Sequence, residues 1–172
     1  YMLRGFLKCA WLVRQRLDNP SNEDFSKPAV VVANHQSFID ILILLSLSPK
    51  FVMVTANWVW TSPHIGRIAR TADFINVRDG YETAIEHLRR KVALGYSVVV
   101  FPERTRSADL TVHRFHKGAF YMAEQLGLDI VPIVLYGTGM VLPKKEPSRI
   151  KKGVMITHIL PRISLSETTM GD

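Results

Sequence analysis

The stretch VVVANHQSFID (residues 30–40) joins a strand pattern directly to a helix pattern. Residues 29–34 are continuous, apolar and rich in β-branched side chains, which is typical of a strand buried on both faces of a parallel sheet. Ser37 and Asp40 then match a capping box, with Ser37 as the N-cap of a helix. The stretch therefore predicts a strand, a short polar loop and a helix in immediate succession.

The same alternation continues along the chain. Strands are expected at residues 29–34, 50–56, 73–77, 96–102, 129–137 and 153–160, and helices at residues 38–48, 59–72, 80–95 and 117–128. The second helical region holds one short helix or two, because Pro63 and Gly66 interrupt it. Strands that alternate with helices predict an α/β fold with a central, largely parallel sheet flanked by helices.

The first 17 residues mix apolar and cationic side chains in a helical pattern. We expect an N-terminal amphipathic helix here, which lies either in a membrane interface or on the core of the domain itself. The turn formers of residues 18–28 follow it. The expected organisation is an N-terminal helix and linker in residues 1–27 and one domain in residues 28–172.

The chain is basic, with 22 Lys and Arg against 15 Asp and Glu and a net charge of +7. This charge suits an anionic partner, such as a phosphate ester, an anionic lipid surface or nucleic acid. The basic patches lack the interleaved aromatic residues of a protein that binds single strands. The single cysteine, Cys9, excludes an internal disulfide. The sequence contains no run of about 18 apolar residues, so no membrane-spanning helix is predicted.

His35 and Asp40 form the first candidate site. On one continuous helix their offset would turn the two side chains about 140° apart, so they meet only if His35 lies in the loop and Asp40 in the first helical turn. The capping pattern at Ser37 supplies that break. An aspartate on one imidazole nitrogen would prepare the other nitrogen to take a proton from an alcohol. The alternative is that Asp40 only caps the helix.

The second candidate site is the loop that follows the strand at residues 96–102. It presents five polar side chains in a row: Glu103, Arg104, Thr105, Arg106 and Ser107. Two guanidiniums and two hydroxyls suit a phosphate, which arginine binds in a bidentate manner. The alternative is a solvated turn with a surface ion pair.

Other basic residues give weaker signals. Arg78 follows a short strand and either joins the same anion site or faces solvent. His113 and His116 precede a helix start, where basic groups favour an anion, and no further ligands accompany them to form a metal site. The sequence lacks the glycine-rich patterns of nucleotide cradles and the serine elbow of hydrolases.

Three segments in this order, NHQSFID, FPERTRS and IVPIVLYG, resemble the glycerolipid acyltransferase family, which is marked by an H-x4-D motif. These enzymes acylate 1-acylglycerol 3-phosphate and related lysophospholipids. The resemblance covers about residues 29–161, so it implies that residues 28–172 are an acyltransferase domain. The surrounding sequence looks most like acyltransferase domains from Bacteroidetes, some of which are fused to a larger membrane protein.

The resemblance implies a role for each matched residue. His35 would be the general base and Asp40 its orienter in an O-acyl transfer from acyl-CoA or acyl carrier protein to a lysolipid hydroxyl. Glu103, Arg104, Thr105, Arg106 and Ser107 would bind the acceptor, with Arg106 on its phosphate. Arg78 and Pro132 would complete the substrate site, Pro132 on the acyl-donor side. No metal and no cofactor are expected beyond the acyl donor.

Two residues depart from the family pattern. Arg104 stands where the family usually has glycine, and Val77 stands where it tends to have aspartate. If position 104 needs a positive φ, an arginine there costs stability. Both departures bear on the identity of the acceptor more than on the chemistry.

The resemblance also implies a location and partners. We expect a peripheral protein on the cytoplasmic face of the inner membrane, bound to an anionic lipid surface. The expected partner is a lysolipid acceptor, and no binding of nucleic acid is expected. Two alternatives remain open: an O-acyltransferase for another lysolipid, such as an amino-acid lipid, and a non-catalytic module that binds lipid or acyl carrier protein.

Overall fold

The computed structural model describes residues 12–55, 57–61, 65–72, 74–76, 80–146 and 149–165. The strands are β1 (Val13–Asp18), β2 (Val30–Ala33), β3 (Phe51–Thr55), β4 (Ile75–Asn76), β5 (Ser97–Val100), β6 (Ile130–Tyr136) and β7 (Gly153–Ile159). The helices are α2 (Ile39–Leu47), α3 (Asn57–Thr61), α4 (Ile65–Thr71), α5 (Tyr81–Ala93), α6 (Gly118–Leu126) and α7 (Thr138–Val141). No helix in these ranges is long and apolar enough to cross a membrane.

The strands form one sheet in the order β1-β7-β6-β2-β5-β3-β4. All neighbouring pairs are parallel except β6 and β7, which are antiparallel. The predicted α/β fold with a largely parallel sheet is therefore confirmed. All four residues of β2 are buried, because this strand lies between β5 and β6 and helices cover both of its faces.

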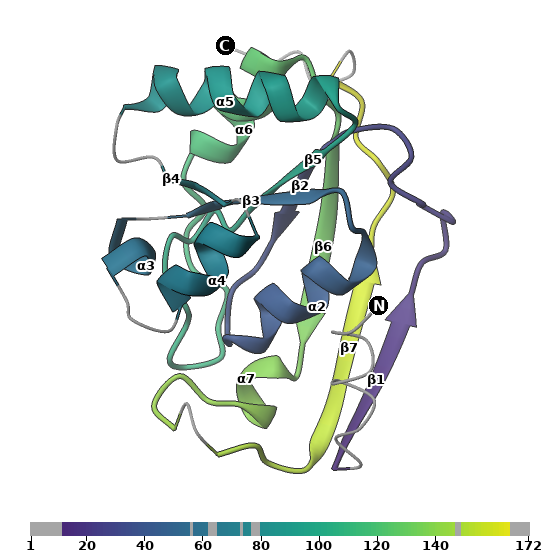
Figure 1. Cartoon of the computed structure of the whole chain (residues 1–172). Coiled ribbons are helices and arrows are strands. Elements are labelled where there is room, and N and C mark those ends of the chain that lie inside the picture. Colours follow the sequence, from purple (N-terminus) through teal and green to yellow (C-terminus); the bar gives the residue numbers. More distant parts are fainter. Residues whose placement is uncertain are drawn as a thin grey trace.

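Two helical layers enclose the centre of the sheet. In Figure 1, α5 and α6 lie above it, and α2, α3 and α4 lie below it. On the α5 side, Ala84, Ile85 and Leu88 pack with every second valine of β2 and β5, namely Val30, Val32, Val98 and Val100. On the other side, Ile43 and Leu44 of α2 pack with the alternate residues of the same strands and with β6 and β7.

The N-terminal prediction is wrong for the residues that the structure describes. Val13–Asp18 form the edge strand β1 instead of the end of an amphipathic helix. β1 pairs in parallel with β7 along its own whole length, from Val13 opposite Gly153 to Asp18 opposite His158. The reason is tertiary, because this pairing satisfies backbone groups that β7 would otherwise leave open at the sheet edge. The remainder of the predicted helix, residues 1–11, lies outside the described residues.

Candidate active site

The candidate site lies where β2 and β5 end. These strands are parallel neighbours, with Val32 opposite Val100, so the loops that follow them leave the same edge of the sheet. The first loop is fixed by Asn34, whose side-chain amide donates to the Leu135 carbonyl (2.9 Å) and accepts from the Leu135 amide (2.7 Å). The pair ties the start of the loop to β6. The role of Asn34 was not predicted, because a polar residue after a strand carries no sign of its partner.

His35 and Asp40 meet, as the loop-then-helix interpretation requires. The His35 Nδ1 atom lies 3.0 Å from Oδ2 of Asp40, which is fully buried. Because the carboxylate can only accept, Nδ1 carries the proton and the Nε2 atom is left to act as a base. A carboxylate placed in this way also stabilises the imidazolium that forms when Nε2 takes a proton.

Asp40 also supports the start of α2. Its Oδ2 atom accepts hydrogen bonds from the backbone amides of Gln36 and Ser37, both at 2.7 Å. The Ser37 hydroxyl accepts from the Ile39 amide (3.3 Å) and donates to the Leu142 carbonyl just after α7 (2.8 Å). The helix itself has Phe38 as its N-cap residue and no side-chain cap hydrogen bond, so the predicted N-cap role of Ser37 is wrong. One carboxylate oxygen of Asp40 nevertheless holds both the loop before α2 and the imidazole.

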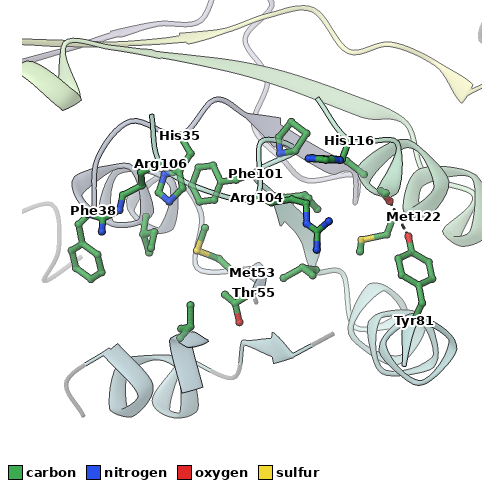
Figure 2. Close-up of a pocket in the computed structure, with 17 residues that line it drawn as sticks. His35, Phe38, Met53, Thr55, Tyr81, Phe101, Arg104, Arg106, His116 and Met122 are labelled. Carbon is green, nitrogen blue, oxygen red and sulfur yellow. Dashed lines mark hydrogen bonds between the residues drawn. The ribbon is translucent and has the colours of Figure 1, made fainter. Parts of the chain in front are cut away.

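The imidazole ring is held from a second side by Phe101. The two ring centroids are 3.9 Å apart and the planes are inclined by 13°, so the rings are stacked. Asp40 fixes the position of Nδ1, and the Phe101 ring limits rotation of the imidazole plane. His35 also lines a cavity (Figure 2).

The cavity has a volume of about 320 Å³ and a mostly apolar wall. Its apolar side chains come from six helices and strands and from the loops beside them: Phe38, Ile41, Met53, Val54, Val59, Tyr81, Val100, Phe101, Pro102, Ala119 and Met122. Burial raises the pKa of Tyr81 to about 12, and its hydroxyl donates to the Gly118 carbonyl (2.8 Å). The apolar wall was not predicted, because an apolar position facing a cavity has the same sequence pattern as one facing the core.

Of the five predicted residues in the loop after β5, two line the cavity and three do not. Arg104 and Arg106 line the cavity together with His116. Figure 2 shows Arg106 toward the Phe38 end and Arg104 toward the Met122 end. Within the described part of the chain neither guanidinium forms an ion pair, so both are available to an anion.

Arg104 adopts the conformation that the glycine of the family pattern would favour. Its φ is +63°, in the left-handed region. A residue with a Cβ atom pays roughly 1–2 kcal/mol for this conformation. The strain is thus present in this chain, and the side chain that causes it points into the cavity.

The other predicted residues of this loop turn away from the cavity. The Glu103 carboxylate accepts from two backbone amides, those of His35 (2.7 Å) and His113 (2.8 Å). The Ser107 hydroxyl donates to Asp109 (2.7 Å). Thr105 is exposed and accepts from Lys144 at 3.3 Å. The side chains that the structure brings to the cavity are therefore the two arginines.

Pro132 and Arg78 are the remaining predicted substrate-binding residues. Pro132 lies within β6 opposite Val32 and is not part of the cavity wall. Arg78 lies outside the described residues. Lys144, which was not predicted, donates to the carbonyl of Arg106 (2.7 Å) and so helps to fix the loop. In the described ranges no group of three or more His, Cys, Asp or Glu side chains is arranged to hold a metal ion.

The chain belongs to the Acyltransferase family, whose profile matches residues 13–136. This match covers most of the chain and includes the His35 and Glu103 loops. Together with the relatives and the solved structure described next, this match confirms the predicted resemblance to acyltransferases of the 1-acylglycerol-3-phosphate type. The finer resemblance to Bacteroidetes domains stays a prediction.

Two curated relatives illustrate the similarity. A 1-acyl-sn-glycerol-3-phosphate acyltransferase of Chlamydomonas reinhardtii is 34% identical over 163 residues, which are 91% of this chain and 48% of the relative. A chloroplastic 1-acyl-sn-glycerol-3-phosphate acyltransferase of Arabidopsis thaliana is 39% identical over 131 residues, which are 74% of this chain and 36% of the relative. The chain therefore spans about half or less of the length of these relatives.

A solved structure is similar over nearly the whole chain. The crystal structure of the 1-acyl-sn-glycerophosphate acyltransferase PlsC from Thermotoga maritima superposes with a TM-score of 0.79 at 25% identity. The match covers 98% of this chain and 70% of that one. The mixed, mostly parallel sheet with flanking helices is thus shared with that acyltransferase.

Proposed function

We propose that this chain is an O-acyltransferase domain that moves a fatty acyl group from a thioester donor to the hydroxyl of a lysophospholipid of the 1-acylglycerol-3-phosphate type. The observation that carries the proposal is the buried Asp40 carboxylate on Nδ1 of His35, with the imidazole at the edge of an apolar cavity. The relatives named above are acyltransferases for this acceptor.

The proposed reaction uses His35 as a general base and forms no acyl-enzyme. Nε2 takes the proton of the acceptor hydroxyl as its oxygen attacks the thioester carbonyl carbon. The tetrahedral intermediate collapses, the carbon–sulfur bond breaks, and the thiolate takes the proton back from His35. The products are an ester and a free thiol, and the imidazole returns to its starting state.

Acyl-CoA and acyl carrier protein carry the same thioester, so both remain proposed donors. The apolar wall of the cavity is suited to an alkyl chain. The Arg104 and Arg106 guanidiniums that line it are suited to a phosphate. We assign the acceptor phosphate to Arg106, which lies in the same loop as the residues that hold His35.

The test is acyl transfer by purified protein, with the product identified by mass from a mixture of lysolipids and acyl donors. His35→Ala should abolish transfer and leave the circular dichroism spectrum unchanged. His87→Ala is the matched control, because this histidine is exposed on α5. Near-normal transfer by His35→Ala would rule out the proposed mechanism.

Arg106→Ala tests the acceptor. If the acceptor carries a phosphate, the variant should raise the acceptor KM with a smaller change in kcat. An unchanged KM, with an amino-acid lipid as the preferred acceptor in the mixture, would favour the other acyltransferase interpretation. Thiol release without any acceptor would indicate a thioesterase instead.

We also propose that the protein acts peripherally at the cytoplasmic face of the inner membrane. The net charge of +7 supports attraction to an anionic leaflet, at about 1 kcal/mol for each cation near the surface. Co-sedimentation should be stronger with anionic than with zwitterionic vesicles and should weaken as salt is added. Equal binding to both vesicle types would contradict this location.

A further inference from the structure

Three consecutive backbone amides beside the candidate base are bound by carboxylates of the protein itself. The His35 amide donates to Glu103, and the Gln36 and Ser37 amides donate to Asp40, all at 2.7 Å. Successive amides that point inward in this way form an anion-binding concavity. In this protein two carboxylates fill it, and only one of them touches the imidazole.

Glu103 is buried and does not line the cavity. Its residue is 4% exposed, and its carboxylate is not part of the cavity wall, to which Pro102, Arg104 and Arg106 all contribute. Both oxygens are engaged, Oε1 by the His35 amide and Oε2 by the His113 amide. The role as an acceptor ligand that the family resemblance implied therefore has no support in the position of this side chain.

The Glu103 loop holds the main chain of His35 at two points. Glu103 accepts from the His35 amide, and the Ser107 amide donates to the His35 carbonyl at 2.8 Å. The same loop carries Arg106 on the cavity side. The backbone position of the base and the position of the cation are thus set by one short segment.

We propose that Glu103 is a positioning residue for His35. It bridges the main chain of the base to residue 113, and so fixes the distance between Nε2 and a substrate held by Arg106. The inference rests on the proposed acyltransferase function for its kinetic consequence. Its structural part, the hydrogen bond to the His35 amide, is independent of any activity.

Glu103→Gln is the decisive variant. An amide side chain has one accepting oxygen, so it satisfies at most one of the two backbone donors, and its NH₂ group then opposes the other. Misplacement of a catalytic group by about 1 Å costs up to about 100-fold in rate. We expect kcat to fall by about 10- to 100-fold, while the acceptor KM stays within about twofold of wild type. Arg106→Ala should show the opposite pattern.

A matched control and a spectroscopic signal separate positioning from general damage. Glu124→Gln removes the same charge from an exposed position of α6 and should leave kcat and KM unchanged. The Nδ1 proton of His35, assigned by its loss in His35→Ala, should be visible by NMR in wild type and in the control. In Glu103→Gln this resonance should shift or broaden while resonances of α5 stay in place.

If Glu103→Gln does not fold, wild-type protein still tests the inference. The His35 amide should exchange with solvent much more slowly than the amides of exposed residues 111 and 112. Rapid exchange of the His35 amide would overturn the proposal, as would a raised KM with normal kcat in Glu103→Gln. Absence of acyl transfer by wild type would refute the proposed function alone, since the NMR and exchange measurements need no turnover.

Discussion

Replacement of Asp40 by asparagine is the most informative perturbation of the candidate dyad. In wild type, Oδ2 accepts three hydrogen bonds, from Nδ1 of His35 and from the amides of Gln36 and Ser37. Among the described residues, the other oxygen, Oδ1, is buried without a hydrogen-bond partner. The isosteric amide can keep its oxygen at the Oδ2 position, so the geometry survives and the charge is lost.

The cost in stability follows from the three bonds. A hydrogen bond to a charged acceptor contributes about 1.5–3 kcal/mol and a neutral one about 0.5–1.5 kcal/mol. Each bond therefore weakens by roughly 1 kcal/mol, or roughly 3 kcal/mol in all. This is a large part of the stability of a typical domain, about 5–15 kcal/mol, so we expect Asp40→Asn to be less stable than wild type but still folded at 25 °C. Urea unfolding followed by circular dichroism measures it.

The cost in activity is larger. Without the carboxylate, the imidazolium that forms as Nε2 takes the proton loses its stabilising charge. General base catalysis contributes roughly 10²–10⁴-fold to the rate, so we expect kcat of Asp40→Asn to fall within that range. Initial rates of acyl transfer under saturating donor and acceptor measure it.

A double-mutant cycle with His35→Ala tests whether Asp40 acts through His35. If Asp40 acts through His35, the double variant should be no less active than His35→Ala alone, because the carboxylate has no imidazole left to stabilise. If instead the two losses multiply, the residues act independently and the dyad interpretation is wrong. Near-normal activity of Asp40→Asn would lead to the same conclusion.

Three further predictions concern strain, the cavity and acid stability. Arg104→Gly should raise the free energy of unfolding by up to about 1 kcal/mol, since glycine adopts a φ of +63° without strain but loses more entropy on folding; a clear drop in Tm would contradict this. Val54→Phe should narrow the cavity and lower kcat/KM for long-chain donors at least about 10-fold relative to short-chain donors, with overpacking costing about 1–3 kcal/mol; an equal loss for all chain lengths would refute the assignment of the acyl chain to this cavity. A hydrogen bond from Lys27 lowers the pKa of Asp129 in the folded protein, so its contribution to stability is complete above the ordinary aspartate pKa of about 4 and is lost as the pH falls through the folded value. Acid unfolding of Asp129→Asn should therefore be less steep below about pH 4 than that of wild type, and equal slopes would show that the pair adds nothing.

The central elements were predictable because their local patterns agree with their tertiary surroundings. The continuous valines of β2 and the amphipathic pattern of α5 each had one consistent interpretation, and the structure follows it. In the segment before them, the local pattern disagrees with the tertiary surroundings. Val13–Asp18 has a helical distribution of apolar and cationic residues, yet it pairs with β7, which is about 140 residues away and leaves no signal in the local sequence.

Some residues of the candidate site could be predicted from the sequence and others could not. His35, Asp40 and the two arginines could be inferred because their chemistry is specific and they follow strands. The actual orientation of Glu103 could not be inferred, since a glutamate between a proline and an arginine is equally able to face a substrate or a backbone amide. Only the placement of the His35 and His113 amides around it decides the matter.

The two loops work as one site because of the strand order. β2 and β5 are far apart in the sequence and adjacent in the sheet, so His35 and Glu103 end at the same edge. The loop that contains Glu103 then contacts the loop after β2 twice. The Glu103 side chain accepts from the His35 amide, and the Ser107 amide donates to the His35 carbonyl. A change that shifts β5 relative to β2 would strain both of these contacts and the strand pairing beneath them, whereas a change at Glu103 removes only the contact to the His35 amide. The first kind should affect stability before catalysis, and the second kind should affect catalysis in a protein that remains folded.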